Sequence, residues 1–336
     1  MDVSTSPAGP APTALLLTAE PAIEARGLRK AYGGKVAVEG LDLEVAGGTV
    51  LGFLGPNGAG KTTAIRMLST VLRPDRGSFA VARIPHTRPA EIRRRIGVLP
   101  ESAGYPPTQT AEEWLVYHLR LCGSSRRAAG SEARRLLADV GLEERARSRI
   151  AGLSRGLRQR LGIARALVDN PEVVFLDEPT LGLDPGGQRQ VLDLVARVAS
   201  DHGVTVVLST HTLAEVEQVC NRVVILNRGR IVADGTVREI VRRAAAPRRG
   251  VVQVPPGHQA QAIEALDRGR ISAGKAPNGR HDEIEIMLPA ALPAEEAATA
   301  ALRCLLDADV PVLGFQVEGG GLSDAFLSVT EGSADD

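Results

Sequence analysis

The strongest chemical signal in this 336-residue sequence is a glycine-rich loop that ends in lysine and threonine. The stretch from Gly55 to Thr62 fits the pattern GxxxxGK[ST], directly after the apolar run Val50–Leu54 and directly before a segment with helical periodicity. Glycines in such a loop let backbone N–H groups curve around phosphate oxygens, and the start of the helix adds partial positive charge. Because strand and helix are both in place, the sequence favours a phosphate-binding loop over an ordinary glycine-rich turn.

The side chains of this loop indicate which phosphates it holds. The Lys61 ammonium can reach the β- and γ-phosphates of a nucleoside triphosphate, and the Thr62 hydroxyl can bind Mg²⁺. We therefore expect ATP and Mg²⁺ as cofactors. The expected ATP ligands in the loop are Gly55, Pro56, Asn57, Gly58, Ala59, Gly60, Lys61, Thr62 and Thr63.

A second chemical signal is a pair of carboxylates that follows an apolar run. Residues 173–176 are all apolar, and Asp177 and Glu178 come next. This pattern fits a buried parallel strand, whose carboxyl end is where open α/β sheets bind ligands. We expect Asp177 to bind Mg²⁺ through water and Glu178 to orient or deprotonate the attacking water. A strand end that meets a helix cap is the alternative interpretation, and the phosphate loop upstream argues against it.

Strand-like and helix-like segments alternate around these motifs, which predicts an α/β fold with a parallel sheet covered on both faces. Two short strands before the phosphate loop predict a small antiparallel sheet, and residues 112–152 predict a helical insertion. The predicted strands are 22–25, 40–45, Val50–Leu54, Ile96–Leu99, 173–176 and 205–209, and the predicted helices are 62–72, 157–168 and 188–199.

The chain divides into parts of different composition. Residues 1–20 are rich in Pro, Ala, Ser and Thr and are predicted to form a flexible tail, and residues 21–240 carry every motif above. A shift to Arg, Ala and Pro near residues 241–250 predicts a linker. Residues 251–332 follow with the element order βαββαβ, which predicts a small α+β domain of the ferredoxin-like kind.

Composition excludes several classes of protein. The 40 basic and 40 acidic side chains balance to zero formal charge, which argues against a protein that holds nucleic acid by bulk electrostatics. No apolar run approaches the roughly 18 residues needed to span a bilayer. The cysteines at 122, 220 and 304 have no metal-ligand spacing, so we expect buried, reduced thiols and a cytoplasmic protein.

A further motif, Leu153-Ser154-Arg155-Gly156-Leu157, lies between the phosphate loop and the acid pair. It resembles the signature motif of ATP-binding-cassette (ABC) ATPases, in which a serine and a glycine open a helix. A helix start with Ser154 as its N-cap is a natural anion site. The resemblance implies that Ser154 and Gly156 complete the nucleotide site of a second subunit.

Other segments are similar to the remaining motifs of that family, in the same order. Tyr32 corresponds to an aromatic that stacks on adenine, and Glu101 stands in the Q-loop region, which implies a contact with Mg²⁺ or the attacking water. Asp184 belongs to a segment that resembles the D-loop. His211 ends a predicted strand and resembles the switch histidine that touches the γ-phosphate. The resemblance therefore implies the ABC ATPase cassette fold for residues 21–240, with an antiparallel β subdomain and a helical subdomain.

Two departures from the family pattern indicate a branch within it. Arg155 and Leu157 replace a glycine and a glutamine of the usual signature, and Glu101 stands where glutamine is common. An ionised glutamate accepts hydrogen bonds but donates none, so its contact would differ. Both departures, and the C-terminal stretch 322–330, resemble the ATPases of daunorubicin-resistance-type exporters.

The resemblance implies an ATP-hydrolysing subunit that forms a homodimer and energises a separate membrane permease, most simply for export of a drug or antibiotic. It would then lie at the cytoplasmic face of the cell membrane, held there by the permease. We expect permease contacts at residues 101–105 and 112–152, where Trp114, Tyr117 and Leu121 either join the surface or pack in the core. An importer subunit with a regulatory C-terminal domain and a soluble ATPase without a permease remain alternatives.

Overall fold

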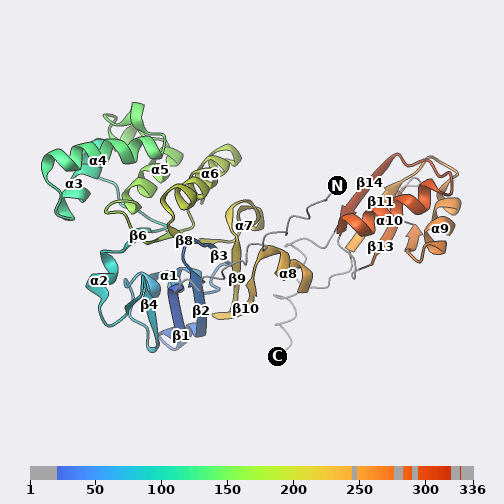
Figure 1. The fold of residues 1–336 in the computed structure, drawn as a ribbon, viewed down its shortest axis with the longest axis horizontal. Helices are drawn as coiled ribbons and strands as arrows, with labels where there is room; N and C mark the ends of the chain where they lie inside the picture. The colour runs from blue at the N-terminus through green and yellow to red at the C-terminus, as the bar shows by residue number, and fades with distance from the viewer. Residues whose placement is uncertain (1–20, 244–247, 276–282, 290–293, 319–325, 327–336) are drawn as a thin grey trace, which may run out of the picture.

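The structure is a computed structural model that describes residues 21–243, 248–275, 283–289, 294–318 and 326. The predicted tail at 1–20 and most of the stretch after residue 318 lie outside the described residues. The described elements form three sheets, and the first two together build the part of the chain that carries the motifs (Figure 1).

The first sheet is antiparallel, in the order β2–β1–β4–β5, and forms the predicted antiparallel subdomain. Its strands are β1 (Pro21–Tyr32), β2 (Lys35–Ala46), β4 (Arg76–Val81) and β5 (Ile84–Pro85). The first two strands are much longer than the sequence predicted. Gly27 and Gly40, with φ of 57° and 67°, lie at register shifts inside the β1–β2 hairpin and do not end the strands.

The second sheet is central and mainly parallel, in the order β10–β9–β3–β8–β7–β6. The antiparallel partner β10 closes one edge, and the other strands run parallel to one another. The strands are β3 (Val50–Leu54), β6 (Ile96–Leu99), β7 (Val173–Asp177), β8 (Thr205–Thr210), β9 (Arg222–Asn227) and β10 (Arg230–Gly235). The sheet places the carboxyl ends of β3, β7 and β8 side by side.

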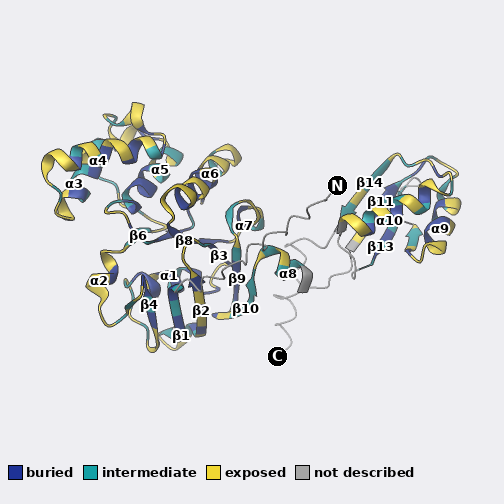
Figure 2. Cartoon of the chain, in the orientation of Figure 1, coloured by how far each residue is buried: buried dark blue, intermediate teal, exposed yellow. Residues whose placement is uncertain are grey.

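Helices cover both faces of the central sheet, as predicted. Along β7, Val174 and Leu176 pack against helices α5 (Arg155–Ala166) and α6 (Pro185–His202), and Val173 and Phe175 pack on the opposite face. That opposite face carries α1 (Lys61–Leu68) and the antiparallel sheet. Such alternation is the expected geometry of a strand buried on both sides, and the central strands are buried in Figure 2.

The predicted helical insertion is a pair of helices, α3 (Ala111–Leu121) and α4 (Arg126–Asp139), followed by 3-10 turns at Glu143–Arg145 and Ile150–Gly152. Thr110 begins α3 with a capping box, in which its hydroxyl accepts from the Glu113 N–H. Trp114 is buried in the core of this subdomain with only 4% exposed surface. The indole of Trp114 is therefore a packing group.

Short elements escaped the sequence analysis. Helices α2 (Pro89–Arg93), α7 (Leu213–Val219) and α8 (Val237–Arg243) are five to seven residues long, too short for a clear periodicity. Helix α6 is longer than predicted because a proline at its first turn and Gly203 in the left-handed region at its end define its limits.

The third sheet is antiparallel, in the order β12–β13–β11–β14, and has a core of its own. Its elements are β11 (Arg248–Gln253), α9 (Gln259–Arg268), β12 (Ser272–Lys275), β13 (Glu283–Leu288), α10 (Ala294–Leu306) and β14 (Gly314–Glu318). They follow the order βαββαβ along the chain. Helix α8 runs to Arg243 and β11 begins at Arg248, so both elements extend into the range 241–250 predicted for the linker.

Candidate nucleotide-binding site

The phosphate loop connects β3 to α1 and touches neighbouring backbone so closely that two of its glycines cannot be replaced. A Cβ on Gly55 would lie 2.3 Å from the carbonyl oxygen of Leu226, and one on Gly60 would lie 2.4 Å from that of Ala37. Gly60 also has φ of 108°, which L side chains rarely adopt. These contacts hold the loop against β2 and β9, so its backbone N–H groups have a fixed curvature.

Lys61, the first residue of α1, is a buried cation with 6% exposed surface. Its Nζ donates to the carbonyl oxygen of Gly55 at 2.6 Å and to that of Pro56 at 3.3 Å. The same Nζ lies 3.6 Å from Oε1 of Glu178. The loop thus holds a desolvated positive charge beside a carboxylate, which suits the binding of phosphate oxygens.

Asp177 is the last residue of β7 and is buried, with only 3% of its surface exposed. Its Oδ1 accepts hydrogen bonds from the hydroxyl of Thr62 at 3.0 Å and from that of Ser209 at 2.7 Å. Thr62 belongs to α1 and Ser209 to β8, so the carboxylate connects the phosphate loop with two strands. The sequence analysis missed Ser209, because its contact depends on β7 and β8 being neighbours in the sheet.

Glu178 adopts a backbone conformation that is unusual for a residue with a side chain, with φ of 49°. Its N–H donates to Ser209 Oγ at 2.9 Å, and its Oε2 lies 3.0 Å from Nδ1 of His211. Backbone strain of this kind costs of order 1–3 kcal/mol and persists where the surrounding structure imposes it. The turn after β7 therefore aims the Glu178 carboxylate at both Lys61 and His211.

A cleft of about 610 Å³ brings most of the predicted site residues together. Tyr32, with 47% exposed surface, lies in its wall with the hairpin residues Lys35, Val36 and Ala37, which the sequence analysis did not single out. The predicted site residues among its lining are Tyr32, Asn57, Gly58, Ala59, Gly60, Lys61, Thr62, Thr63, Glu101, Glu178 and His211. The cleft opens at the carboxyl ends of the parallel strands, where such sheets bind ligands.

Six predicted residues are absent from this lining: Gly55, Pro56 and Asp177 lie directly beside Lys61 and Thr62, whereas the other three lie on helix starts elsewhere. Ser154 caps α5, and its Oγ accepts from the N–H of Leu157 at 3.3 Å. Gly156 follows in the first turn of α5, and Asp184 occupies the N-cap position of α6 without a side-chain cap bond. The guanidinium of Arg155, next to Ser154, packs against Gly182. A Cβ on Gly182 would lie 2.4 Å from a guanidinium nitrogen of Arg155. The signature and the D-loop segment are thus in contact with each other.

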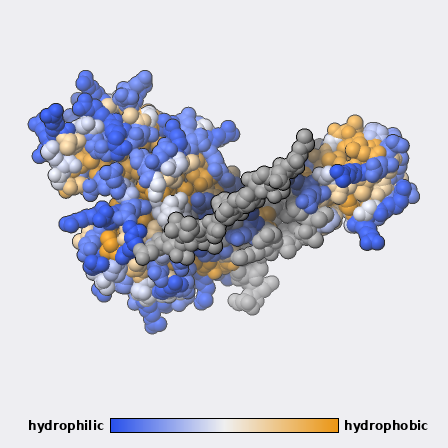
Figure 3. Space-filling view, viewed as in Figure 1, coloured by the Kyte–Doolittle hydropathy of each residue, from blue (hydrophilic) through white to orange (hydrophobic). Residues whose placement is uncertain are grey.

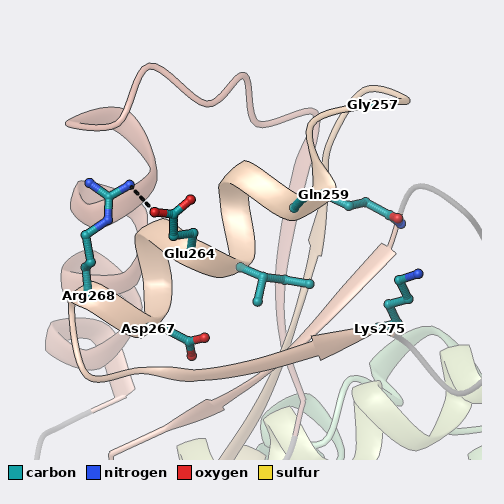
Figure 4. A pocket seen from close by; sticks show the side chains of 8 residues that line it. Gly257, Gln259, Glu264, Asp267, Arg268 and Lys275 are labelled. Atoms are coloured by element: carbon teal, nitrogen blue, oxygen red, sulfur yellow. Dashed lines mark ion pairs between the residues drawn. The ribbon is translucent and has the colours of Figure 1, made fainter.

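A second hollow lies elsewhere, on the C-terminal sheet between α9 and β12 (Figure 4). Gln259, Glu264, Asp267, Arg268 and Lys275 line it, with Glu264 paired to Arg268 at 3.7 Å. Its charges are mixed, and no sequence motif falls on it. Among the residues that the structure describes, no group of three or more metal-ligating side chains is found.

The cysteines differ in part from the prediction of buried thiols. Cys122 is exposed, and Cys220 and Cys304 are partly buried; all of them are free thiols. Burial raises the pKa of Cys220 to about 12, and the charge of Glu215 adds to this shift. Cys122 ends α3 at the surface, so helical context alone did not predict its exposure.

Geometry and fold together define the class of the protein. A helical subdomain stands between the phosphate loop and the acid pair, and its last helix opens at Ser154. This arrangement is the ATP-binding cassette, and the chain is an ATPase of that class. None of the helices in the described residues is both long and apolar enough to span a membrane. Figure 3 shows mainly hydrophilic residues on the visible face of the helical subdomain.

Comparison with known proteins shows the family. The sequence profile of the ABC transporter family matches residues 38–181. The chain is 38% identical to the daunorubicin/doxorubicin resistance ATP-binding protein DrrA of Streptomyces peucetius, over 94% of each chain. It is 31% identical to the linearmycin resistance ATP-binding protein LnrL of Bacillus subtilis, over 92% of this chain and 98% of that one. The chain belongs to the ABC transporter ATP-binding proteins.

Solved structures agree with this assignment. A dimeric ATP-binding cassette in a post-hydrolysis state, bound to ADP and Pi, matches with a TM-score of 0.59 at 25% identity, over 64% of this chain and 98% of that one. The ATP-binding subunit of an ABC transporter matches with a TM-score of 0.57 at 32% identity, over 66% and 92%. The predicted cassette fold is confirmed, and ATP hydrolysis by a transporter subunit is the activity of the class.

Proposed function

We propose that this protein hydrolyses ATP to drive a separate membrane permease that exports a drug, an antibiotic or another hydrophobic compound. The observation that carries the catalytic part is the convergence of Lys61, Glu178 and His211 on one cleft with the phosphate loop. The export part is supported by the names of the relatives, DrrA and LnrL, which are resistance proteins for daunorubicin or doxorubicin and for linearmycin.

The donor set of the cleft fits MgATP. Thr62 and Asp177 present oxygen atoms 3.0 Å apart, and oxygen ligands are those that Mg²⁺ prefers. We assign the metal to these two residues, with Glu101 in reach of the same cleft. Bound Mg²⁺ neutralises charge on the phosphate oxygens. Lys61 meets the β- and γ-phosphates, and Tyr32, exposed at the rim, stacks on the adenine.

Glu178 is the group that orients and deprotonates the attacking water. Its side chain lines the cleft with only 11% of its surface exposed, and its carboxylate has a hydrogen-bond partner in His211. His211 holds the Glu178 carboxylate through Nδ1 and leaves its other ring nitrogen for the γ-phosphate. Positioning of this kind is the main source of catalysis in phosphoryl transfer.

Ser154, Gly156 and Asp184 act in a second copy of the chain. They lie on helix starts outside the cleft of their own chain, and a helix N-terminus with free N–H groups is an anion site. A homodimer in which each signature faces the partner's phosphate loop gives these residues a ligand. The solved relative in its dimeric, ADP- and Pi-bound state supports that arrangement.

The permease contact lies on the helical subdomain. Tyr117 and Leu121 stand one turn apart on α3, with 52% and 66% exposed surface, and so present an apolar strip. In the same subdomain, Tyr105 donates its hydroxyl to the carbonyl of Arg158, and its ring packs on Trp114 of α3. Residues 101–105 are thereby joined to the signature helix. Binding here places the protein at the cytoplasmic face of the membrane, without nucleic acid as a partner.

The C-terminal sheet, which begins at Arg248, forms an accessory domain of the ferredoxin-like kind. The support is the order βαββαβ, together with a sheet in which the first and third strands are central and antiparallel. It carries no nucleotide motif, so we assign it to assembly or regulation of the transporter.

Co-purification from membranes tests the export function. Tagged wild-type protein should retain a membrane permease, and candidate drugs should stimulate the ATPase activity of that complex. Tyr117→Arg places a charge on the apolar strip and should release the permease, whereas Arg120→Ala, at an exposed position on the same helix, should retain it. Recovery of a solute-binding protein with the complex would instead identify an importer.

A further inference from the structure

Glu215 is a buried carboxylate that the catalytic description leaves without a role. It lies in the first turn of α7 with 4% exposed surface. Its Oε1 accepts from the hydroxyl of Thr180 at 2.7 Å, and its Oε2 accepts from that of Thr210 at 2.6 Å. No ion pair involves Glu215 in the part of the chain that the structure describes. Burial of a charge supported only by hydroxyls is costly, which calls for an explanation beyond packing.

The two hydroxyls belong to segments at the ends of the neighbouring strands β7 and β8, which contribute Glu178 and His211 to the cleft. Thr180 follows Glu178 by two residues and leads into the segment that ends at Asp184. Thr210 directly precedes His211 at the end of β8. One carboxylate therefore connects the loop of the candidate base to the loop of the candidate switch histidine.

In the two hydrogen bonds to Glu215, the threonine hydroxyls are the donors and the carboxylate is the acceptor. An ionised carboxylate only accepts, so both threonine hydroxyls must donate to it. Thr210 Oγ1 also accepts from the N–H of Thr212 at 3.0 Å, so its proton is directed to Glu215. Both bonds are charge-assisted and short, the kind that holds geometry most firmly. The carboxylate thus fixes both loops relative to one element, α7.

We propose that Glu215 is a positioning residue for ATP hydrolysis, because it joins the loop after Glu178 to the loop that carries His211 so that they move as one unit. The proposal rests on the roles proposed above for Glu178 and His211. It makes the 3.0 Å contact between those two side chains depend on a third side chain, the carboxylate of Glu215, which bonds to neither of them. A misplacement of about 1 Å at such a site can lower the rate by about 10²-fold.

A purely local role for Glu215 makes different predictions. If it only stabilised the start of α7, the nearby Thr210 bond would matter and the Thr180 bond would not. Loss of the Thr210 bond would then lower the melting temperature and leave kcat of the folded protein unchanged, and loss of the Thr180 bond would change neither. The positioning role requires both bonds, and it lowers kcat while KM for MgATP stays the same, since no phosphate ligand is altered.

The test removes each hydroxyl separately in the full-length protein. Thr180→Val and Thr210→Val keep the shape of the side chain and delete the donor, whereas Thr180→Ser and Thr210→Ser keep the donor. We expect both valine variants to lose about 10- to 100-fold in kcat with unchanged KM, and both serine variants to retain activity near wild type. Glu217→Gln, at an exposed position on the same helix, is the matched control and should leave kcat unchanged.

Wild-type kcat in a folded Thr180→Val protein would overturn the proposal, as would a fall in melting temperature without a fall in kcat. Glu215→Gln keeps the shape of the side chain and provides a further measurement if a valine variant fails to fold. It should also lower kcat with KM unchanged. Wild-type kcat in this variant would overturn the proposal. Glu178→Gln, measured in parallel, tests the assignment of Glu178 as the base separately from the role of Glu215. Full activity in Glu178→Gln would remove the assigned base, whereas full activity in Thr180→Val alone would remove only the role of Glu215.

Discussion

The ammonium group of Lys61 lies 3.6 Å from the carboxylate of Glu178, and both face the same cleft. The cation proposed to bind the phosphates and the carboxylate proposed to act on the water are therefore direct neighbours. Their charges attract, but their proposed tasks differ: Lys61 binds the ground state and Glu178 serves the chemical step. Substitutions at the two positions should therefore have separable effects on binding and turnover.

Lys61→Ala should weaken MgATP binding and abolish measurable turnover, because it removes the charge that meets the β- and γ-phosphates. A hydrogen bond to a charged group contributes about 1.5–3 kcal/mol, which corresponds to roughly 10- to 100-fold in affinity. Equilibrium binding of a fluorescent ATP analogue measures the first effect and phosphate release the second. Lys35→Ala, at the exposed end of the cleft wall, is the control and should change both much less. Unchanged binding in Lys61→Ala would contradict the phosphate-loop assignment.

Local motifs predicted the part of the site that depends on neighbours in sequence. The phosphate loop and the Asp177–Glu178 pair are each set by a few consecutive residues, and the limits of β3 and β6 agree with the prediction because each is a short, largely apolar run. The role of His211 was predicted from the resemblance, and its side chain lines the cleft.

The remaining contacts depend on strand order, which no local pattern encodes. Ser209 meets Asp177 because β8 lies beside β7 in the sheet, and Glu215 meets Thr180 because α7 packs at that same edge. The lengths of β1 and β2 were underestimated for a different reason: glycines at bulges have the sequence appearance of strand ends.

Gly97 sets the distance between β6 and the signature helix α5, so Gly97→Ala should destabilise the cassette. A Cβ at this position would lie 1.7 Å from the carbonyl oxygen of Ala166, a backbone atom that cannot move without shifting the helix. Overpacking of this kind costs about 1–3 kcal/mol, and we expect the upper end of that range. Urea denaturation measures the loss.

Gly130→Ala is the matched control for that substitution. Gly130 lies inside α4, and a Cβ there meets nothing within 4 Å. Alanine in place of glycine within a helix stabilises by roughly 0.5–1 kcal/mol, so the two substitutions should have opposite signs. Equal destabilisation by both would show that the contact with Ala166 does not govern the packing of α5.

The cysteines should differ in their reactivity toward alkylating reagents. Only the thiolate reacts, and burial raises the pKa of Cys220 to about 12, so this thiol stays protonated at about pH 8. Cys122 has its pKa raised less severely, by partial burial and the charge of Asp169, and it is exposed. Mass spectrometry after brief iodoacetamide treatment should find Cys122 modified first. Modification of Cys220 should require unfolding in guanidinium, and rapid labelling of Cys220 in the native protein would contradict its placement.

Deletion of residues 246–336 should leave MgATP binding intact, because every nucleotide motif precedes that point. It should still lower the stability of the cassette, since Phe326 packs against the cluster of Leu54, Val216, Val223, Ile225 and Ile240. Phe326→Ala in the full-length chain isolates this contribution. We expect the truncated protein and Phe326→Ala to share a lower melting temperature with unchanged nucleotide affinity. Loss of ATP binding in a folded truncation would place the domain boundary elsewhere.

Glu178→Gln should separate chemistry from binding. The amide keeps the size of the side chain and removes the base and its negative charge, while Thr62 and Asp177 remain for Mg²⁺ and Lys61 remains for phosphate. Loss of a positioned base typically costs about 10²- to 10⁴-fold in rate. MgATP affinity should survive or increase, because the carboxylate beside Lys61 no longer competes with phosphate for the cation. Turnover at the wild-type rate would show that Glu178 is not the base.

In the proposed homodimer, hydrolysis of the two bound nucleotides would open the interface, so binding without turnover should also let this dimer accumulate. Size-exclusion chromatography with light scattering should therefore detect an ATP-dependent dimer of Glu178→Gln. Ser154, at the start of α5, is assigned to the partner's nucleotide, so adding Ser154→Ala should weaken that dimer. Ser125→Ala, which removes the corresponding cap of α4 away from the cleft, is the control and should leave the dimer intact. A turnover-deficient variant that stays monomeric with ATP would show that dimerisation requires the permease.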